Sequence, residues 1–232
     1  MRLLFIGNSY LHDNGGVPNK AAEMIRATQP SREVTVSSMT RNGGYLDQWD
    51  LDKVLAEAAA ADIVVLQGHS TTTTTPEKRA RFRTVLAEMI PAIRAAGAEP
   101  MLYMTPAYRE THRRYDPQMI EVIREGYGAA ARDNGVAVIP VGEAFEDANG
   151  ADPNARLHQT DGSHPTRAGT YLAAATVALA LSDGANYHRE FAGTLHEAEA
   201  ADLWQAARAA LFACPSSTLL AIREIPPDAA SC

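Results

Sequence analysis

Short hydrophobic runs alternate with amphipathic segments along most of the chain. The hydrophobic runs predict strands at 2–7, 33–39, 62–67, 99–104 and 136–141. Segments with helical spacing of apolar residues predict helices at 17–28, 48–60, 76–96, 117–134 and 165–182. The strand runs are almost continuously apolar, which is typical of parallel strands that are buried on both faces. We therefore expect an α/β fold, a three-layer α/β/α sandwich around a five-stranded parallel sheet.

Composition narrows the class of protein without changing this fold. Hydrophobic residues make up 46% and charged residues 21% of the 232 positions, as in soluble globular proteins. The net charge of -7 argues against nucleic acid as a partner. The apolar N-terminus is interrupted early by Gly7, Asn8 and Ser9, and no apolar stretch reaches about 18 residues. We expect a cytoplasmic protein with no membrane partner.

Polar and glycine residues follow each predicted strand. The carboxyl ends of parallel strands meet at one edge of a sheet, where ligands of open α/β folds bind. The segments expected at this edge are Gly7-Asn8-Ser9, Arg41-Asn42-Gly43-Gly44, Gln67-Gly68-His69-Ser70, Thr105-Pro106 and Asp161-Gly162-Ser163-His164-Pro165. The sequence thus predicts a site that combines a hydroxyl, amide donors and an acid–base pair.

Asp161 and His164 are the predicted acid–base pair. A hydrolytic serine needs an imidazole to accept its proton and a carboxylate to orient that imidazole. Ser9 supplies a hydroxyl directly after the first strand. Alone, Ser9 and Asp161 also fit a helix-capping role, because Ser and Asp are common N-caps, and His164 fits an exposed position near the first turn of a helix. Their combination at one sheet edge favours the catalytic interpretation.

These segments together resemble the blocks of the SGNH/GDSL hydrolase superfamily. Gly7-Asn8-Ser9-Tyr10 resembles the nucleophile block, and Asp161-Gly162-Ser163-His164-Pro165 resembles the acid–base block. The resemblance covers roughly Met1 to Leu181 and implies a flavodoxin-like SGNH hydrolase fold. We expect residues 1–185 to form an SGNH hydrolase-like catalytic domain, and residues 186–232 to add a C-terminal helical appendage and tail to the same domain.

The resemblance implies roles for individual residues of a serine esterase. Ser9 matches the nucleophile, and Asp161 and His164 match the catalytic pair. The backbone N–H groups of Ser9 and Gly44 (or its neighbour Gly43) match oxyanion-hole donors. Where most members have an Asn, this chain has Gln67, and that block is similar to the sialate O-acetylesterase and acetylxylan esterase branch. Gln67 is accordingly expected to donate its amide to the oxyanion.

Two other interpretations stay open. The segment Leu66-Gln67-Gly68-His69-Ser70 resembles the nucleophile elbow of α/β-hydrolases, which would make Ser70 the nucleophile, although Thr72 replaces the closing glycine of that motif. Alternatively, the same loops could bind an ester or a sugar without turning it over.

The remaining polar residues indicate no further chemistry. Arg109, with Ser70, is a candidate contact on the rim of the substrate site. The histidines show no metal-ligand spacing, and the two cysteines, Cys214 and Cys232, form no zinc or disulfide pattern. We therefore expect no metal and no cofactor. The predicted partner is a small-molecule ester, with short acyl groups on a carbohydrate favoured by the resemblance of the Gln67 block.

Overall fold

A five-stranded parallel sheet forms the centre of the molecule. The structure, a computed structural model, describes residues 1–182 and 189–213. The strands are β1 (Arg2–Gly7), β2 (Thr35–Thr40), β3 (Ile63–Gln67), β4 (Glu99–Tyr103) and β5 (Ala137–Ile139). They lie in the order β2-β1-β3-β4-β5, and every neighbouring pair is parallel. The expected α/β fold with a five-stranded parallel sheet is confirmed.

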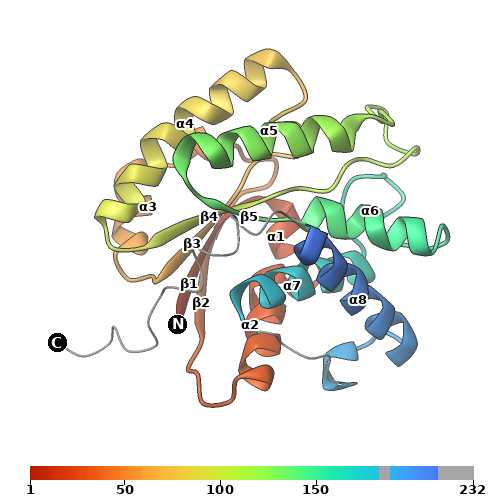
Figure 1. The fold of residues 1–232 in the computed structure, drawn as a ribbon. Coiled ribbons are helices and arrows are strands. Elements are labelled where there is room, and N and C mark those ends of the chain that lie inside the picture. The colour runs from red at the N-terminus through yellow and green to blue at the C-terminus, as the bar shows by residue number, and fades with distance from the viewer. Residues whose placement is uncertain (183–188, 214–232) are drawn as a thin grey trace.

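Helices cover both faces of this sheet (Figure 1). The α-helices are α1 (Ser9–His12), α2 (Val17–Thr28), α3 (Leu51–Ala58), α4 (Pro76–Ala95), α5 (Met119–Asn134), α6 (Val141–Ala151), α7 (Arg167–Leu181) and α8 (Glu197–Ala213). Short 3-10 helices are η1 (Asp13–Gly15), η2 (Leu46–Gln48) and η3 (Arg189–Ala192). In Figure 1, α3, α4 and α5 lie on one side of the sheet and α2, α7 and α8 on the other.

Strand β1 shows how the continuous apolar runs build two separate cores. Successive side chains of a strand point to opposite faces. Leu3 and Phe5 pack in the cluster that includes residues of α2, α6, α7 and α8. Leu4 and Ile6 pack in the cluster that includes residues of α3, α4 and α5. Both faces of β1 are therefore covered, which requires hydrophobic residues at consecutive positions.

Two α-helices were not predicted from the sequence, the four-residue α1 and the longer α6. The strand predicted at 136–141 is shorter in the structure, because β5 ends at Ile139 and α6 begins at Val141. The segment contains Gly142, which disfavours helix by propensity. The structure requires a glycine there, because a Cβ at this position would lie 2.6 Å from the carbonyl oxygen of Thr105. Close packing of α6 against the end of β4 thus overrides the local preference.

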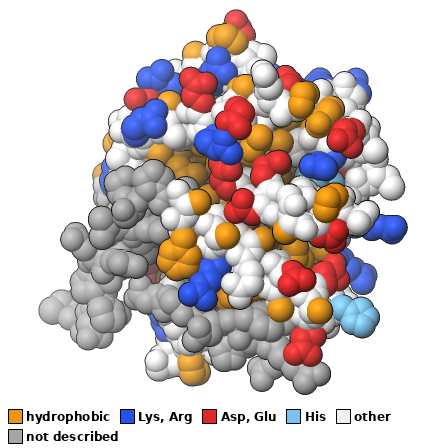
Figure 2. All heavy atoms as spheres, turned by 45° about the vertical axis from the view of Figure 1, so that its right-hand side comes forward, with side chains coloured by type: hydrophobic (Ala, Val, Ile, Leu, Met, Phe, Trp, Pro, Cys, Tyr) orange, Lys and Arg blue, Asp and Glu red, His pale blue; other side chains and the backbone are white. Residues whose placement is uncertain are grey.

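The C-terminal helix α8 shares a core with the rest of the fold. It packs against α6 and α7, and its Trp204 is only 1% exposed. The expected appendage at 186–232 is described only between 189 and 213, so its tail and both cysteines lie outside the described residues. On the face shown in Figure 2, acidic and basic side chains are interspersed with hydrophobic ones. Within the described residues, no helix is both long and apolar enough to span a bilayer.

Candidate active site

The turn after β1 is held by hydrogen bonds to the end of β3 and to the loop after β2. Asn8 has an extended backbone and caps α1, because its Oδ1 accepts a hydrogen bond from the Tyr10 N–H at 3.2 Å. Its Nδ2 donates to the carbonyl oxygen of Gly44 at 3.3 Å, and its backbone N–H donates to Gln67 Oε1 at 2.9 Å. Ser9 follows as the first residue of α1 and is 9% exposed. The ends of β1, β2 and β3 therefore meet around Ser9.

Gln67 lies beneath this turn and is fully buried. Its Oε1 accepts the Asn8 N–H, and its Nε2 donates to the carbonyl oxygen of Gly68 at 2.6 Å. A Cβ at Gly7 would lie 2.4 Å from Gln67 Oε1, so glycine at that position leaves room for the glutamine side chain. Both ends of the Gln67 amide thus bond to the backbone of the site loops.

A compact turn between α6 and α7 carries the predicted acid–base pair. Asp161 Oδ1 accepts hydrogen bonds from the backbone N–H groups of Ser163, at 2.9 Å, and His164, at 3.0 Å. The turn is closed by Gln159, whose N–H donates to the carbonyl oxygen of His164 at 2.7 Å. Gly162 has φ of +69°, and a Cβ there would lie 2.7 Å from the backbone nitrogen of His112. The turn therefore depends on a glycine for both its conformation and its packing.

The structure brings Ser9, His164 and Asp161 into one hydrogen-bonded row. His164 Nδ1 lies 2.6 Å from Asp161 Oδ2, and His164 Nε2 lies 3.0 Å from Ser9 Oγ. A carboxylate can only accept, so the Nδ1 proton points at Asp161 and Nε2 is left as the acceptor for the serine hydroxyl. Ser9 and His164 are 155 positions apart in sequence. The arrangement is that of a nucleophile, a general base and an orienting acid.

The electrostatics of the turn favour an ionised Asp161. Partial burial raises the pKa of Asp161. Hydrogen bonds from the His164 ring and from the N–H groups of Ser163 and His164 together lower this pKa by more than burial raises it, so the net shift is downward. The side chain of Asp161 is 46% exposed and that of His164 is 38% exposed. The side chains of Asp161 and His164 are therefore partly open to solvent, whereas Ser9 is buried.

The predicted oxyanion donors differ in their hydrogen bonding. The N–H of Gly44 donates to the carbonyl oxygen of Arg41 at 3.0 Å, closing a turn. The amide of Gln67 donates to Gly68, as described above. Across residues 1–182 and 189–213, none of the hydrogen bonds is donated by the Ser9 backbone N–H. Of these three donors, the Ser9 N–H is the one that has no acceptor within the described chain.

Two buried pairs of hydroxyl groups lie beside this row, and the sequence analysis assigned no role to three of their four residues. The Tyr10 hydroxyl lies 2.7 Å from Ser163 Oγ, and the Ser70 hydroxyl lies 2.7 Å from the Tyr108 hydroxyl. All four residues are less than 9% exposed. The only sequence signal was position, since Tyr10 follows the predicted nucleophile and Ser163 lies inside the acid–base segment. Ser70 makes its 2.7 Å bond with a tyrosine rather than with a histidine.

Aromatic and histidine rings stack on the loops after β2 and β3. The rings of Tyr45 and His69 are 4.3 Å apart and nearly parallel, at 6°. The His69 ring nitrogen Nδ1 lies 3.1 Å from Thr71 Oγ1, to which Lys78 Nζ donates at 2.9 Å. Burial, together with the charges of Lys78 and Arg114, lowers the pKa of His69 to about 4. His69 is therefore a neutral ring at physiological pH.

The backbone of the predicted rim residue Arg109 is hydrogen-bonded to the acid–base turn. Its backbone N–H donates to the carbonyl oxygen of Gly162 at 2.8 Å. Its charge contributes, after burial, to the lowered pKa of His158 and opposes the raised pKa of Glu146. Arg109 thus joins the loop after β4 to the turn that holds His164.

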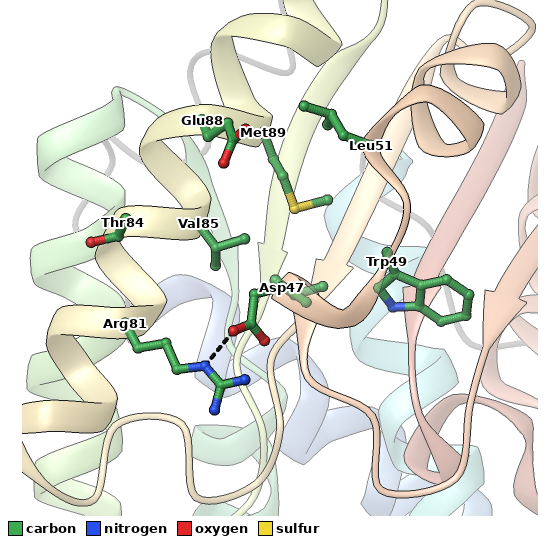
Figure 3. Close-up of a pocket in the computed structure, with 9 residues that line it drawn as sticks. Asp47, Trp49, Leu51, Arg81, Thr84, Val85, Glu88 and Met89 are labelled. Atoms are coloured by element: carbon green, nitrogen blue, oxygen red, sulfur yellow. Dashed lines mark hydrogen bonds and ion pairs between the residues drawn. The ribbon is translucent and has the colours of Figure 1, made fainter.

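A surface pocket of about 310 Å³ lies between η2, α3 and α4 (Figure 3). Arg81 and Asp47 form an ion pair at its lower end in this view. The guanidinium of Arg81 also lies 4.9 Å from the centre of the Tyr45 ring. The pocket is lined by Leu46, Asp47, Trp49, Leu51, Arg81, Thr84, Val85, Glu88 and Met89. Its lining contains none of the three residues of the hydrogen-bonded row, so it is separate from the candidate catalytic residues.

Comparison with known proteins identifies the family. A family model described as the GDSL-like lipase/acylhydrolase family matches residues 5–172, which include every residue of the hydrogen-bonded row. The chain belongs to this family. It is therefore a carboxylic ester hydrolase of the SGNH type, as the sequence analysis predicted. A search of curated proteins finds no match.

Solved structures show the same fold. A DUF4886 family protein from Bacteroides uniformis has a TM-score of 0.74 at 18% identity, covering 92% of this chain and 95% of the other. A protein from Slackia heliotrinireducens that is assigned to the SGNH hydrolases has a TM-score of 0.63 at 29% identity, covering 77% and 97%. The acetylxylan esterase Axe2 from Geobacillus stearothermophilus has a TM-score of 0.58 at 18% identity, covering 75% and 91%. The GDSL-like chain thus has the SGNH hydrolase architecture that the sequence predicted.

The site of this GDSL-like hydrolase holds side chains suited to acyl transfer. Within the described part of the chain, no three His, Cys, Asp or Glu residues are grouped so that they could hold a metal ion. Ser9, His164 and Asp161 are the hydrogen-bonded side chains of this site that can take part in acyl transfer.

Proposed function

We propose that this chain is a serine esterase that works through an acyl-enzyme on Ser9. The observation that carries the proposal is the unbroken row of hydrogen bonds from Asp161 Oδ2 through the His164 ring to Ser9 Oγ, at 2.6 and 3.0 Å. Such a row lets an imidazole accept the serine proton while a carboxylate stabilises the charged ring.

The proposed reaction has two halves. In the first, Ser9 Oγ attacks the ester carbonyl carbon, its proton passes to His164 Nε2, and the tetrahedral intermediate collapses to an acyl-enzyme. His164 returns the proton to the leaving alkoxide, which departs as the alcohol. In the second half, His164 takes a proton from water, and the resulting hydroxide attacks the acyl carbon. The bond from that carbon to Ser9 Oγ then breaks, and His164 returns the proton to Ser9 Oγ. Asp161 keeps the His164 ring oriented throughout.

The oxyanion of each tetrahedral intermediate needs N–H donors aimed at it. The Ser9 backbone N–H is the first proposed donor, supported by its lack of an acceptor among the described residues. Gln67 is the second, because its amide nitrogen carries two N–H groups and the bond to Gly68 uses one. Gly44 is the third, and its N–H would exchange the turn bond with Arg41 for the oxyanion.

The proposed substrate class is a short acyl ester, with acetyl groups on a carbohydrate as the first choice. Two independent likenesses support this choice. The block that contains Gln67 resembles the sialate O-acetylesterase and acetylxylan esterase branch, and the fold resembles two acetylxylan esterases with TM-scores of 0.63 and 0.58. Arg109 and Ser70 stay proposed as residues near the substrate rim.

Covalent labelling tests the proposed nucleophile. An organophosphonate that carries an aryl leaving group should modify wild-type protein at Ser9, as mapped by peptide mass spectrometry. The Ser9→Ala variant should take up no label and should lose nearly all aryl acetate turnover, because a triad acts as a unit. Ser70→Ala is the matched control, since it removes a nearby buried serine hydroxyl that bonds to Tyr108.

The outcomes separate the alternatives. A label on Ser70, or full labelling of Ser9→Ala, would establish the nucleophile-elbow interpretation instead. Absence of both labelling and turnover for every ester would mean that these loops bind a ligand without catalysis. A panel of aryl esters from acetyl to decanoyl, run beside acetylated xylo-oligosaccharides and acetylated sialic acid, tests the substrate class. Preference for a long acyl chain would contradict the proposed acetyl specificity.

A further inference from the structure

Tyr10 connects the nucleophile helix to the acid–base turn. It follows Ser9 directly in α1 and is 4% exposed. Its hydroxyl lies 2.7 Å from Ser163 Oγ, although the two residues are 153 positions apart. Ser163 is itself 8% exposed and lies between Asp161 and His164. This buried hydrogen bond therefore joins helix α1, which carries Ser9, to the turn that carries Asp161 and His164.

The ring of Tyr10 makes a second contact with the same turn. It stands nearly edge-on to the His164 ring, with the centroids 5.7 Å apart and the planes at 74°. Aromatic rings prefer this arrangement because of their quadrupoles. Ser163 in turn donates its backbone N–H to Asp161 Oδ1 at 2.9 Å. Tyr10 thus touches His164 directly and reaches Asp161 through Ser163.

The acid–base turn lies in an exposed connection, so contacts that fix its position relative to α1 affect the geometry of the site. It belongs to the connection between α6 and α7, outside the sheet, and the side chains of Asp161 and His164 are 46% and 38% exposed. The distance from His164 Nε2 to Ser9 Oγ depends on where this loop stands relative to α1. A displacement of about 1 Å in an active site can cost on the order of 100-fold in rate. The buried hydroxyl bond fixes that relative position, because leaving either hydroxyl unpaired in a buried site is unfavourable.

We propose that Tyr10 is a positioning residue of this esterase, which holds the Asp161–His164 turn against Ser9 through its hydroxyl bond to Ser163. The proposal rests on the proposed function of Ser9, His164 and Asp161. Burial raises the pKa of Tyr10 above its usual value, so the phenol stays neutral and keeps its proton near pH 7. Tyr10 does not touch the reacting atoms and takes no proton during the reaction.

Removing one hydroxyl at a time tests the bond. Tyr10→Phe keeps the ring and its edge contact with His164 but loses the hydroxyl, and Ser163→Ala loses the other partner. We expect each variant to lower kcat by roughly 5- to 100-fold, with KM within about twofold. The free-energy cost of leaving a buried hydroxyl without its hydrogen bond corresponds to a rate ratio of this size. The double variant should be little worse than either single variant, since both remove the same interaction. Additive losses would contradict a shared role.

A proton resonance gives a readout that does not require turnover. The His164 Nδ1 proton, held between the ring and Asp161 at 2.6 Å, should give a downfield line in the ¹H NMR spectrum, identified by its loss in His164→Ala. In Tyr10→Phe and Ser163→Ala this line should shift upfield or broaden through exchange with solvent. If no ester is hydrolysed but the line responds in this way, the positioning inference holds and the proposed function fails.

Tyr127→Phe is the matched control. Tyr127 is a fully buried tyrosine of α5 that packs against Phe82 of α4, in the cluster that contains Leu4 and Ile6 of β1. We expect this variant to keep the downfield line unchanged and kcat within about twofold. The inference is overturned if Tyr10→Phe and Ser163→Ala match Tyr127→Phe in both line and kcat, or if their only effect is a lower Tm.

Discussion

Substitution of Gln67 by glutamate separates two roles that this buried side chain can have. In the structure its Oε1 accepts the Asn8 N–H at 2.9 Å and its Nε2 donates to the carbonyl oxygen of Gly68 at 2.6 Å. A protonated glutamate has nearly the same shape and can make both bonds, with its carbonyl to Asn8 and its hydroxyl to Gly68. It lacks the second N–H, which is the group proposed to donate to the oxyanion. Burial is expected to keep that carboxyl protonated.

Gln67 can donate to the oxyanion and can hold the turn that carries Ser9, and these two roles predict different effects on kcat and on the free energy of unfolding. Loss of one oxyanion donor lowers kcat by on the order of 100- to 1,000-fold, or about 2.7 to 4 kcal/mol of transition-state stabilisation. Gln67→Glu should show this loss in kcat with a small change in stability. Gln67→Ala should show the same loss and also unfold more easily, by about 1 to 3 kcal/mol for each buried partner left without a bond, here the Asn8 N–H and the Gly68 carbonyl.

The measurement is single-turnover acylation with an aryl acetate at pH 6, beside urea unfolding of each variant. If Gln67→Glu acylates within about threefold of wild type, Gln67 donates nothing to the oxyanion and the proposed donor is wrong. The hydrogen bonds to Asn8 and Gly68 would then be its whole contribution, and Gln67→Ala would act by loosening the turn that carries Ser9. An effect on KM alone would indicate uniform binding of substrate and transition state.

Three further predictions follow from single residues. Asp161→Asn should lower kcat by roughly 100- to 10,000-fold, because the amide no longer selects the His164 tautomer that leaves Nε2 free; retention of half the activity in a steady-state assay would contradict the assigned role. His158 has a pKa lowered to about 4, chiefly by burial, so its unfolded form binds a proton first as the pH falls below ~6.5 and the folded state loses stability. From pH 7 to pH 5 this amounts to at most about 2 kcal/mol, and urea unfolding should show a correspondingly smaller pH dependence in His158→Gln. Gly169→Ala should destabilise the fold by about 1 to 3 kcal/mol or more, because the new Cβ would lie 2.2 Å from the Leu157 carbonyl oxygen; an unchanged Tm would show that α7 can move away.

Sequence alone determined the layered fold because local chemistry and topology agree there. Consecutive apolar residues such as those from Leu3 to Ile6 can be buried only if both faces of the strand are covered. Helical spacing between such runs then requires parallel strands, and parallel strands bring their carboxyl ends to one edge. Ser9, directly after β1, could therefore be placed at this edge from the sequence, whereas the Asp161–His164 pair follows α6 and is brought to Ser9 by the packing of that connection.

Helix α6 and the second half of the site were decided by tertiary packing. Gly142 lowers local helix propensity, yet α6 forms because that glycine lets the helix approach Thr105 within van der Waals distance. The bond between Tyr10 and Ser163 joins residues 153 positions apart through hydroxyl groups, which carry no periodicity that a sequence pattern could detect.

For Gln67, the sequence determined the position of the residue, and the tertiary structure determined the orientation of its amide. The sequence placed it at the carboxyl end of a buried strand, next to the turn that holds Ser9. Which of its two polar atoms faces Asn8 depends on the surrounding N–H and C=O groups, and those come from β1 and from its own loop. An amide can donate or accept with equal ease, so its residue type alone leaves both options open. Only the folded arrangement, in which the Asn8 N–H meets the amide oxygen, selects between them.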